Sequence, residues 1–349
     1  MVKMNKNVKA LNAPKKRIFL FISLLLISFS LQCPGYSQDS SNYIFATATT
    51  SGTYYPVGVA VATLTKIKLE PKYKISLSAI SSAGSGENIK LLRENEAQFA
   101  ILQGLYGAWA WNGSGEFKDL GPQKYLRSIS MLWQNVEHFA VKSDHVRSGN
   151  LNDLEMLKGK RFSIGKRNSG TEGSGQHILE RLGFAPQEDF KLVNLDYGSS
   201  AEALQNGTIE GMNIPAGPPV GAITRAYAAL GKDITILGCT DEQLQKINTG
   251  YQLWTKYTIP AGTYPGQDKA IETFAQPNFM VVRQDIDDDT VYKIVKTIYE
   301  NLDFLMNIHP STRAMSINSA ISGLPIPLHP GAARYYREQG IEIPDHLIQ

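Results

Sequence analysis

Residues 49–58 read "TTSGTYYPVG" and lie between an apolar run, "YIFATA", and a helical pattern, "VAVATLTKI". The apolar residues after the turn recur at helical spacing. Pro56 suits the first turn of a helix, because its missing N–H has no partner to lose there. The stretch therefore predicts a strand that passes directly into a helix. A plain turn needs only the glycine, so the hydroxyl and aromatic residues indicate a further role for this loop.

The triplet Ser-Gly-Thr occurs twice, at matching places of two series of strands and helices. Ser51-Gly52-Thr53 follows the first predicted strand of one series, and Ser169-Gly170-Thr171 follows the strand "KGKRFSIG" that begins the other. A third loop, "SSAGSGEN", opens the helix after the second strand, and Ser85 is its expected cap. Strands alternating with helices at this spacing predict α/β lobes with parallel sheets.

These loops lie where parallel sheets bind ligands, at the carboxyl ends of strands and against helix N-termini. The free N–H groups there favour an anion, and glycine lets a ligand approach the backbone. The alternative is that the three loops are helix caps and nothing more, since Ser, Thr and Gly are preferred there. Tyr54 and Tyr55 exceed what a cap requires and suit the wall of a pocket. Lys166 and Arg167 can pair with a carboxylate or remain solvated loop charges.

The order of the patterns predicts two lobes and two crossings between them. A long β-type run covers residues 126–142, a second series begins near Leu151, and it ends around "PNFMVVRQDI". Ser199 and Glu202 have capping-box spacing in the second series. The expected organisation is a signal peptide at 1–37, the first part of lobe 1 at 38–142, lobe 2 at 143–279, and the return strand and C-terminal helices of lobe 1 at 280–349.

The N-terminus has the pattern of a secretory signal peptide. Lys15, Lys16 and Arg17 precede the apolar stretch "IFLFISLLLISFSL", which is shorter than the roughly 20 residues of a membrane span. Without residues 1–37, 29 basic residues face 32 acidic ones, so nothing favours a nucleic-acid partner. A lipid anchor at Cys33 fits poorly, because Gln32 is not a small residue. Cys239 is then the one cysteine left, which excludes an internal disulfide.

Common enzyme signatures do not occur. "GTEGSG" lacks the spacing of the dinucleotide fingerprint G-x-G-x-x-G, and the chain has neither a P-loop nor a G-x-S-x-G nucleophile motif. The six histidines show no pair at metal-ligand spacing. We expect a binding protein rather than an enzyme, with no cofactor and no metal.

Five segments occur in the same order as in a known family: "FATATTSGTYYPVG", "SSAGSGENIKLLRENEAQFAILQ", "LKGKRFSIGKRNSGTEGSG", "EALQNGTIEG" and "PLHPGAARYYREQG". Together the segments resemble the TAXI family, the solute-binding proteins of one class of tripartite ATP-independent periplasmic (TRAP) transporters. The resemblance implies a type II periplasmic-binding-protein fold, in which two α/β lobes, joined by crossing hinge strands, close over a ligand cleft. It also implies a monomer in the periplasm that captures a small organic anion, such as glutamate or a dicarboxylate. The partner would be a membrane permease driven by an ion gradient.

Most of the expected ligand-binding residues are carried over by position on these motifs. They are Ser51, Gly52, Thr53, Tyr54, Tyr55, Gly84, Ser85, Gln103, Ser169, Gly170 and Thr171. Asn213 is added at one of two departures from the family pattern. Where the family usually reads Gln-Ser-Asp, this chain has Gln103-Gly104-Leu105, and where it usually has Asp-Ala and aromatic residues, this chain has Glu210-Gly211-Met212-Asn213. These departures leave the identity of the ligand open.

Two other functions stay compatible with the sequence. A periplasmic sensory protein of the same fold would pass occupancy to a receptor instead of a permease. An exported enzyme on a related fold would turn over the compound that it binds.

Overall fold

A computed structural model describes residues 40–348, which form two α/β lobes. The expected signal peptide and Cys33 lie outside these residues. In the first sheet β1 (Ser41–Ala46) lies between β2 (Ile75–Ile80) and β3 (Phe99–Gln103), and both pairings are parallel. The connections are α1 (Tyr54–Lys68) and α3 (Ser85–Arg93). Side chains of all three strands, such as Phe45 and Phe99, are fully buried between the helical layers, as expected for parallel strands.

The sheets are mixed rather than purely parallel, which corrects the expectation from the sequence. Three strands complete the first sheet by antiparallel pairing: β11 (Ile271–Arg283) beside β3, β4 (Leu126–Val136) beside β11, and β10 (Thr255–Ile259) beside the start of β11. A strand that returns from the other lobe arrives in the opposite direction. It can therefore extend the sheet only by antiparallel pairing.

The second sheet has the order β7-β6-β8-β5-β9. Its strands are β5 (Phe139–Lys142), β6 (Arg161–Ser163), β7 (Lys191–Val193), β8 (Gly211–Asn213) and β9 (Ile234–Ile236). Strand β6 pairs in parallel with β7 and β8, whereas β5 pairs antiparallel with β8 and β9.

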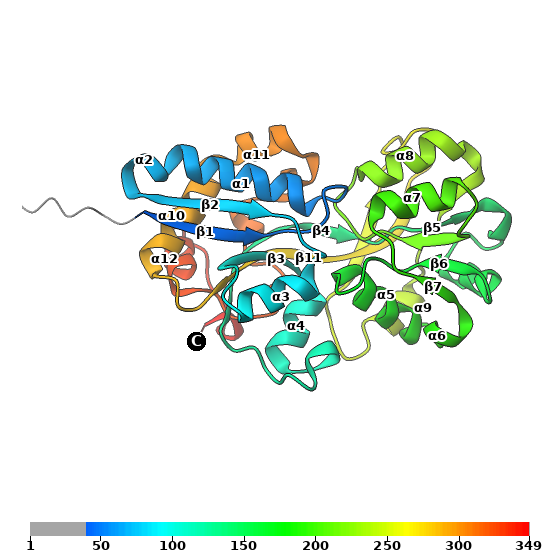
Figure 1. Ribbon diagram of the computed structural model, residues 1–349, viewed down its shortest axis with the longest axis horizontal. Helices are drawn as coiled ribbons and strands as arrows, with labels where there is room; N and C mark the ends of the chain where they lie inside the picture. Colours follow the sequence, from blue (N-terminus) through cyan, green and yellow to red (C-terminus); the bar gives the residue numbers. More distant parts are fainter. Residues whose placement is uncertain (1–39, 349) are drawn as a thin grey trace, which may run out of the picture. The chain divides into compact units, whose positions relative to one another are not determined.

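The chain crosses between the lobes twice, along β4–β5 and along β11 (Figure 1). The single β-run expected over residues 126–142 is two strands, interrupted at Glu137 and His138, and β5 already belongs to the second sheet. The chain therefore enters the second sheet with β5, one short strand before the boundary expected at residue 143. Ile259 of β10 and Ala275 of β11 pack in the hydrophobic cluster of the second lobe. Both crossings are strands, which can act as hinges when the lobes move.

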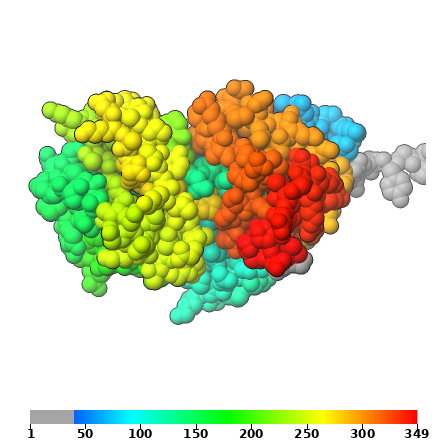
Figure 2. Space-filling model, turned by 180° about the vertical axis from the view of Figure 1, so that it is seen from behind, coloured from blue at the N-terminus to red at the C-terminus, as the bar shows by residue number. Residues whose placement is uncertain are grey.

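The remaining helices cover the two sheets. They are α2 (Glu70–Tyr73), α4 (Gly104–Asn112), α5 (Gly170–Arg181), α6 (Pro186–Asp189), α7 (Tyr197–Gln205), α8 (Gly221–Leu230), α9 (Asp241–Ile247), α10 (Asp288–Tyr299), α11 (Leu302–Ile308) and α12 (Pro330–Glu338). Figure 2 shows the segments after residue 285, in orange and red, gathered on the first lobe, and green to yellow segments forming the second. No helix within residues 40–348 is long and apolar enough to cross a membrane.

Two helix starts differ from the expected caps. Asp196 caps α7, because its Oδ1 accepts from Ser199 N–H at 3.0 Å, and Ser199 therefore does not form a capping box with Glu202. Ser85 is the first residue of α3 rather than its cap, and its hydroxyl accepts from the backbone N–H of Gln103 at 3.1 Å. The N-cap of α3 is Gly84, whose φ of +123° suits glycine.

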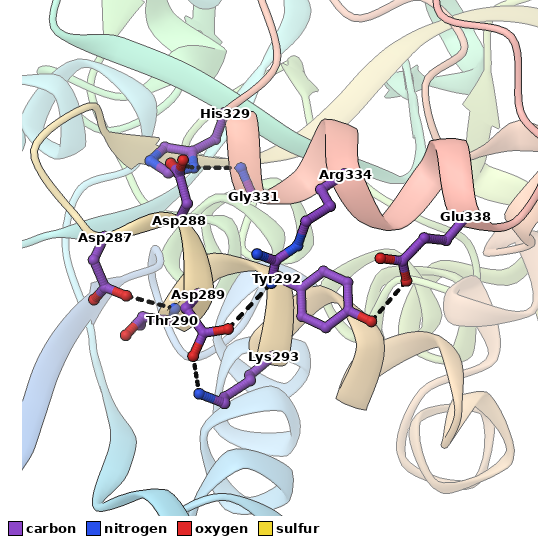
Figure 3. Close-up of polar contacts among 10 residues, drawn as sticks. All are labelled: Asp287, Asp288, Asp289, Thr290, Tyr292, Lys293, His329, Gly331, Arg334 and Glu338. Carbon is purple, nitrogen blue, oxygen red and sulfur yellow. Dashed lines mark hydrogen bonds and ion pairs between the residues drawn. The ribbon is translucent and has the colours of Figure 1, made fainter.

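The C-terminal motif "PLHPGAARYY" fastens α12 to α10 in the first lobe (Figure 3). His329 is fully buried and caps α12, because its Nδ1 accepts from Gly331 N–H at 3.2 Å while Nε2 donates to Ile286 C=O at 2.9 Å. On the surface of the same pair, Arg334 lies over the Tyr292 ring and contacts Asp289 at 3.1 Å. The motif therefore has a structural role in the first lobe.

Replacing His329 by alanine is expected to lower the free energy of unfolding by about 2 kcal/mol. The variant loses the α12 cap, worth roughly 0.5–2 kcal/mol, and leaves the carbonyl of half-buried Ile286 without its donor. Urea unfolding measures the change, and His346→Ala, at an exposed histidine, is the control. Equal stability of the two variants would contradict the structural role of His329.

Candidate functional site

A cavity of about 40 Å³ lies between the lobes and is lined by residues of both. Four helices begin at its wall, two from each lobe. Their first residues, all in the lining, are Tyr54 of α1, Ser85 of α3, Gly170 of α5 and Tyr197 of α7. The first turn of each helix has N–H groups without an intrahelical acceptor, and its dipole is positive at that end. The cavity is therefore suited to an anion.

Nine of the twelve residues expected from the sequence line this cavity. They are Gly52, Thr53, Tyr54, Gly84, Ser85, Gln103, Ser169, Gly170 and Thr171. The other three, Ser51, Tyr55 and Asn213, lie outside the lining. Ser51 and Tyr55 are half-buried beside the first loop, and Asn213 is buried in β8, where its Nδ2 donates to Glu137 Oε2 at 3.0 Å.

Several lining residues were not expected. They are Ala48, Thr49, Ala83, Asn135, Asp196, Tyr197, Pro215 and Ala216. Asp196 and Tyr197 open a helix after a strand, so the reasoning applied to the Ser-Gly-Thr loops also fits them. Asn135 is in the middle of the β-run, where no local pattern marks it. Lys166, named as a possible carboxylate partner, lines the cavity, whereas Arg167 lies on an outer groove.

The first turn of α5 is bound directly to the first lobe. Three consecutive carbonyl groups of the second lobe each accept a hydrogen bond from a donor of the first lobe. Asn168 C=O accepts from Glu87 N–H at 3.0 Å, and Ser169 C=O accepts from the Tyr106 hydroxyl at 3.1 Å. Gly170 C=O accepts from Gln103 Nε2 at 2.5 Å. The structure thus describes a closed arrangement of the two lobes.

Small residues permit this close approach of the two backbones. A Cβ added to Gly86 would lie 2.6 Å from the Asn168 carbonyl oxygen, and one added to Gly170 would lie 2.8 Å from Ser85 Oγ and from the Gln103 side chain. A side chain at Gly86 would hold the lobes apart, because the opposing atom is backbone, whereas one at Gly170 would displace the Gln103 and Ser85 side chains. Gly170, which was expected to line a binding site, thus also lies against the opposite lobe.

The charges in the lining are balanced. Of the described residues, Lys166 is the one cation and Asp196 the one carboxylate at the cavity wall, and the Asp196 oxygens accept from Ser199 N–H and Oγ. Burial raises the pKa of Tyr54 and Tyr197 above the usual value, so both remain neutral hydroxyls. Tyr197 donates to Pro215 C=O at 2.7 Å, and Tyr54 donates to Asn278 Oδ1 at 2.5 Å. Since Lys166 and Asp196 offset each other, the positive character of the cavity comes from the helix N-termini.

Some of these contacts are helix caps, as the alternative interpretation expected. Ser169 Oγ accepts from Glu172 N–H at 3.1 Å and is the N-cap of α5. Thr53 caps nothing with its side chain and instead donates to Gly217 C=O of the second lobe at 3.2 Å. The hydroxyl groups of Thr171 and Tyr197 form a hydrogen bond of 2.8 Å. Capping therefore accounts for Ser169 but not for Thr53 or Thr171.

The described part of the chain contains no cluster of side chains suited to a metal ion. Within residues 40–348, no group of three or more His, Cys, Asp or Glu side chains is placed to hold a metal ion. Burial raises the pKa of the Cys239 thiol to about 12, so it is not a thiolate at neutral pH.

Solved structures with a similar chain path are many and distant in sequence. One from Bordetella bronchiseptica RB50 has a TM-score of 0.51 and 12% identity, over 88% of this chain and 91% of that one. Another, a Xanthomonas citri protein bound to ATP, has a TM-score of 0.50 and 11% identity, over 86% and 95%. The periplasmic aliphatic sulphonate binding protein SsuA from Escherichia coli has a TM-score of 0.43 and 12% identity, over 86% and 84%.

The predicted fold class is confirmed: two α/β lobes are joined by crossing strands, and the Bordetella bronchiseptica and Xanthomonas citri structures share this chain path. At such low identity these structures show the fold alone. The sequence itself matches the NMT1-like family model over residues 45–340. This match runs from β1 to the end of α12 and includes both lobes and the cavity between them. The chain belongs to the NMT1-like family.

Proposed function

We propose that this protein is the extracytoplasmic solute-binding subunit of a TRAP transporter of the TAXI class. It captures a small organic anion in the periplasm and delivers it to a membrane permease driven by an ion gradient. Support comes from the five motifs, which occur in the family's order over nearly the whole chain after the expected signal peptide. The binding-protein fold and the NMT1-like family agree with this function.

The main structural support for the proposal is that four helix N-termini and Lys166 meet at one cavity. N–H groups and helix dipoles stabilise a carboxylate at such a place, and a lysine adds a full charge. Because donors come from both lobes, the closed form binds the anion better than the open form. That difference in affinity is what drives closure.

The proposed ligand-binding residues include the nine expected residues that line the cavity, together with Asn135, Lys166 and Tyr197. Ser51, Tyr55 and Asn213 remain predictions outside the lining. The proposed ligands are an amino acid such as glutamate or a dicarboxylate. The protein performs no chemistry on them and needs no cofactor.

Replacing Lys166 by glutamine is expected to weaken binding of L-glutamate or succinate at least tenfold. The change removes the one cation that the described residues place at the cavity wall, and a charge-assisted hydrogen bond to a carboxylate is roughly twice as strong as a neutral one. Isothermal titration calorimetry measures the affinity. Lys160→Gln, at an exposed lysine of the same lobe, is the matched control. Equal affinities of the two variants would reject Lys166 as a ligand residue.

Transport, sensing and catalysis predict different observations. A gene for a large multi-span permease beside this one supports transport, whereas a receptor kinase gene there favours the sensory alternative. Native mass spectrometry of protein purified from cells identifies a retained solute. If binding is the whole function, mass spectrometry finds that solute unchanged after incubation.

A further inference from the structure

Three side-chain amides beside the cavity form a continuous hydrogen-bonded chain, here called the amide relay: Gln276, Gln103 and Asn135. Gln276 comes from β11, Gln103 from the end of β3, and Asn135 from β4. All three side chains are buried, with at most 2% of any residue exposed. Gln276 and Asn135 are also register partners in the β4–β11 pair.

Two backbone groups determine which way each amide points. Leu105 N–H is a donor and reaches Gln276 Oε1 at 2.8 Å, so the Gln276 amide nitrogen faces Gln103. At the other end, Gly170 C=O is an acceptor and takes a hydrogen bond from Gln103 Nε2 at 2.5 Å. Both constraints direct Gln103 Oε1 toward Gln276 and Asn135. The orientation of Gln103 is therefore fixed independently from two sides.

The orientation of Asn135 follows from that of Gln103. Gln103 Oε1 is an acceptor, so Asn135 offers it the amide nitrogen, at 3.1 Å, while Gln276 Nε2 approaches at 3.4 Å. The Asn135 carbonyl oxygen Oδ1 then remains. It is buried, and within the described residues it has no hydrogen-bond partner, although Asn135 lines the cavity. A buried acceptor without a partner is costly, by roughly 1–3 kcal/mol.

We propose that Asn135 is a specificity-determining residue, whose oriented acceptor selects organic anions that carry an N–H or O–H donor beside the acidic group. The inference rests on the proposed function and narrows its ligand class to amino or hydroxy acids. A ligand with such a donor satisfies Asn135 Oδ1, whereas an analogue with hydrogen there leaves the oxygen unpaired. Sites of this kind reject the analogue without the polar group far more strongly than they reject a missing methylene.

Lobe closure is part of this selectivity. Gly170 C=O belongs to the second lobe, whereas the three amides of the relay belong to strands of the first sheet. In the open form Gln103 loses this acceptor, and only the longer contact from Gln276 still orients it. Closure of the lobes therefore fixes the direction in which the three amides of the relay point at the moment when the ligand is enclosed.

Two pairs of compounds of nearly equal shape test the proposal: L-glutamate against glutarate, and L-malate against succinate. Calorimetry on the wild-type protein is expected to show at least tenfold tighter binding of the amino or hydroxy acid in one pair or both. Equal affinities within both pairs overturn the inference and leave the proposed function standing. If none of the four compounds and no other carboxylate binds, the proposed function fails and the inference fails with it.

Variants assign the selectivity to Asn135. Asn135→Leu keeps the branched shape of the side chain and has no acceptor, so the affinity ratio within a discriminated pair is expected to fall to within threefold. Gln134→Leu, on the neighbouring residue outside the cavity lining, is expected to keep the ratio. Gln103→Met removes the link to Gly170 and is expected to lower both the affinity and the ratio. An unchanged ratio in Asn135→Leu would overturn the assignment.

Discussion

Gly86→Ala is expected to weaken binding of the captured anion on the order of 100-fold, about 3 kcal/mol, while leaving the lobes folded. The added Cβ would lie 2.6 Å from the carbonyl oxygen and 3.1 Å from the carbonyl carbon of Asn168, in the opposite lobe. Both atoms are backbone, so no side-chain rotation relieves the clash. The lobes must therefore stop short of the closed arrangement, and the donors of the second lobe cannot reach the ligand.

The variant should not lose stability in the ligand-free form. Gly86 is the second residue of α3, and alanine favours a helix over glycine by about 1 kcal/mol. Within its own lobe the nearest atom to the new Cβ is a Tyr106 ring carbon, at 3.3 Å, which a small shift of the ring accommodates. A reduced melting temperature would point to a folding defect instead of a closure defect.

Gly221→Ala is the matched control, since Gly221 is the first residue of α8 and its nearest contact would be Arg225 Nη1 at 3.7 Å. Calorimetry gives the affinities, and small-angle scattering with and without ligand gives the degree of closure. The closure argument predicts that Gly221→Ala contracts on binding and Gly86→Ala does not. Wild-type affinity in Gly86→Ala would show that the contact between Gly86 and Asn168 is not needed for binding.

The strand-to-helix loops could be found from the sequence because the backbone geometry behind them is local. A strand, a glycine-containing turn and an amphipathic helix are each visible within some fifteen residues, and parallel sheets place such turns at one edge. The structure brings the three expected loops around one cavity. The same rule, applied to Asp196 and Tyr197, would have added a fourth.

Other features depend on contacts that local patterns do not record. Asn135 lies in the middle of a strand, and its part in the cavity depends on its register with Gln276 and on the position of Gly170 in the other lobe. The antiparallel return of β11 depends on where the chain crosses back, which helix and strand periodicity cannot show. The C-terminal motif supported the family resemblance, but His329 serves α12 and the core of the first lobe.

The interruption between β4 and β5 carries two adjacent buried titratable groups. Burial raises the pKa of Glu137 to about 7, against which the hydrogen bond from Asn213 is a smaller effect. Burial also lowers the pKa of His138 to about 4. His138 is held neutral with the proton on Nδ1, which donates to two carbonyl groups, those of Val136 and Ile214, while Nε2 accepts from the Tyr264 hydroxyl at 2.7 Å.

These two shifts have opposite effects on stability as pH rises. The pKa of Glu137 is about 7 in the folded protein, above its ordinary value of 4.5. Glu137 therefore adds to the free energy of unfolding below pH 4.5, and this contribution is lost as the pH rises to about 7. The pKa of His138 is about 4 in the folded protein, below its ordinary value of 6.5, because burial disfavours the charged ring. The contribution of His138 to the free energy of unfolding is therefore absent at about pH 4 and complete above pH 6.5. Each change is on the order of 3 kcal/mol. In the wild-type protein the two contributions largely offset each other.

Single substitutions should therefore expose two opposite pH dependences. Relative to wild type, the free energy of unfolding of Glu137→Gln is expected to rise by about 3 kcal/mol between pH 4.5 and 7. The reason is that the variant lacks the carboxyl whose stabilising contribution the wild-type protein loses over this pH range. For His138→Asn it is expected to fall by a similar amount between pH 4 and 6.5. Urea unfolding at several pH values measures both, and the difference from wild type at each pH cancels the other titrating groups. Parallel profiles for the three proteins would mean that neither group is buried at the crossing in the way the structure describes.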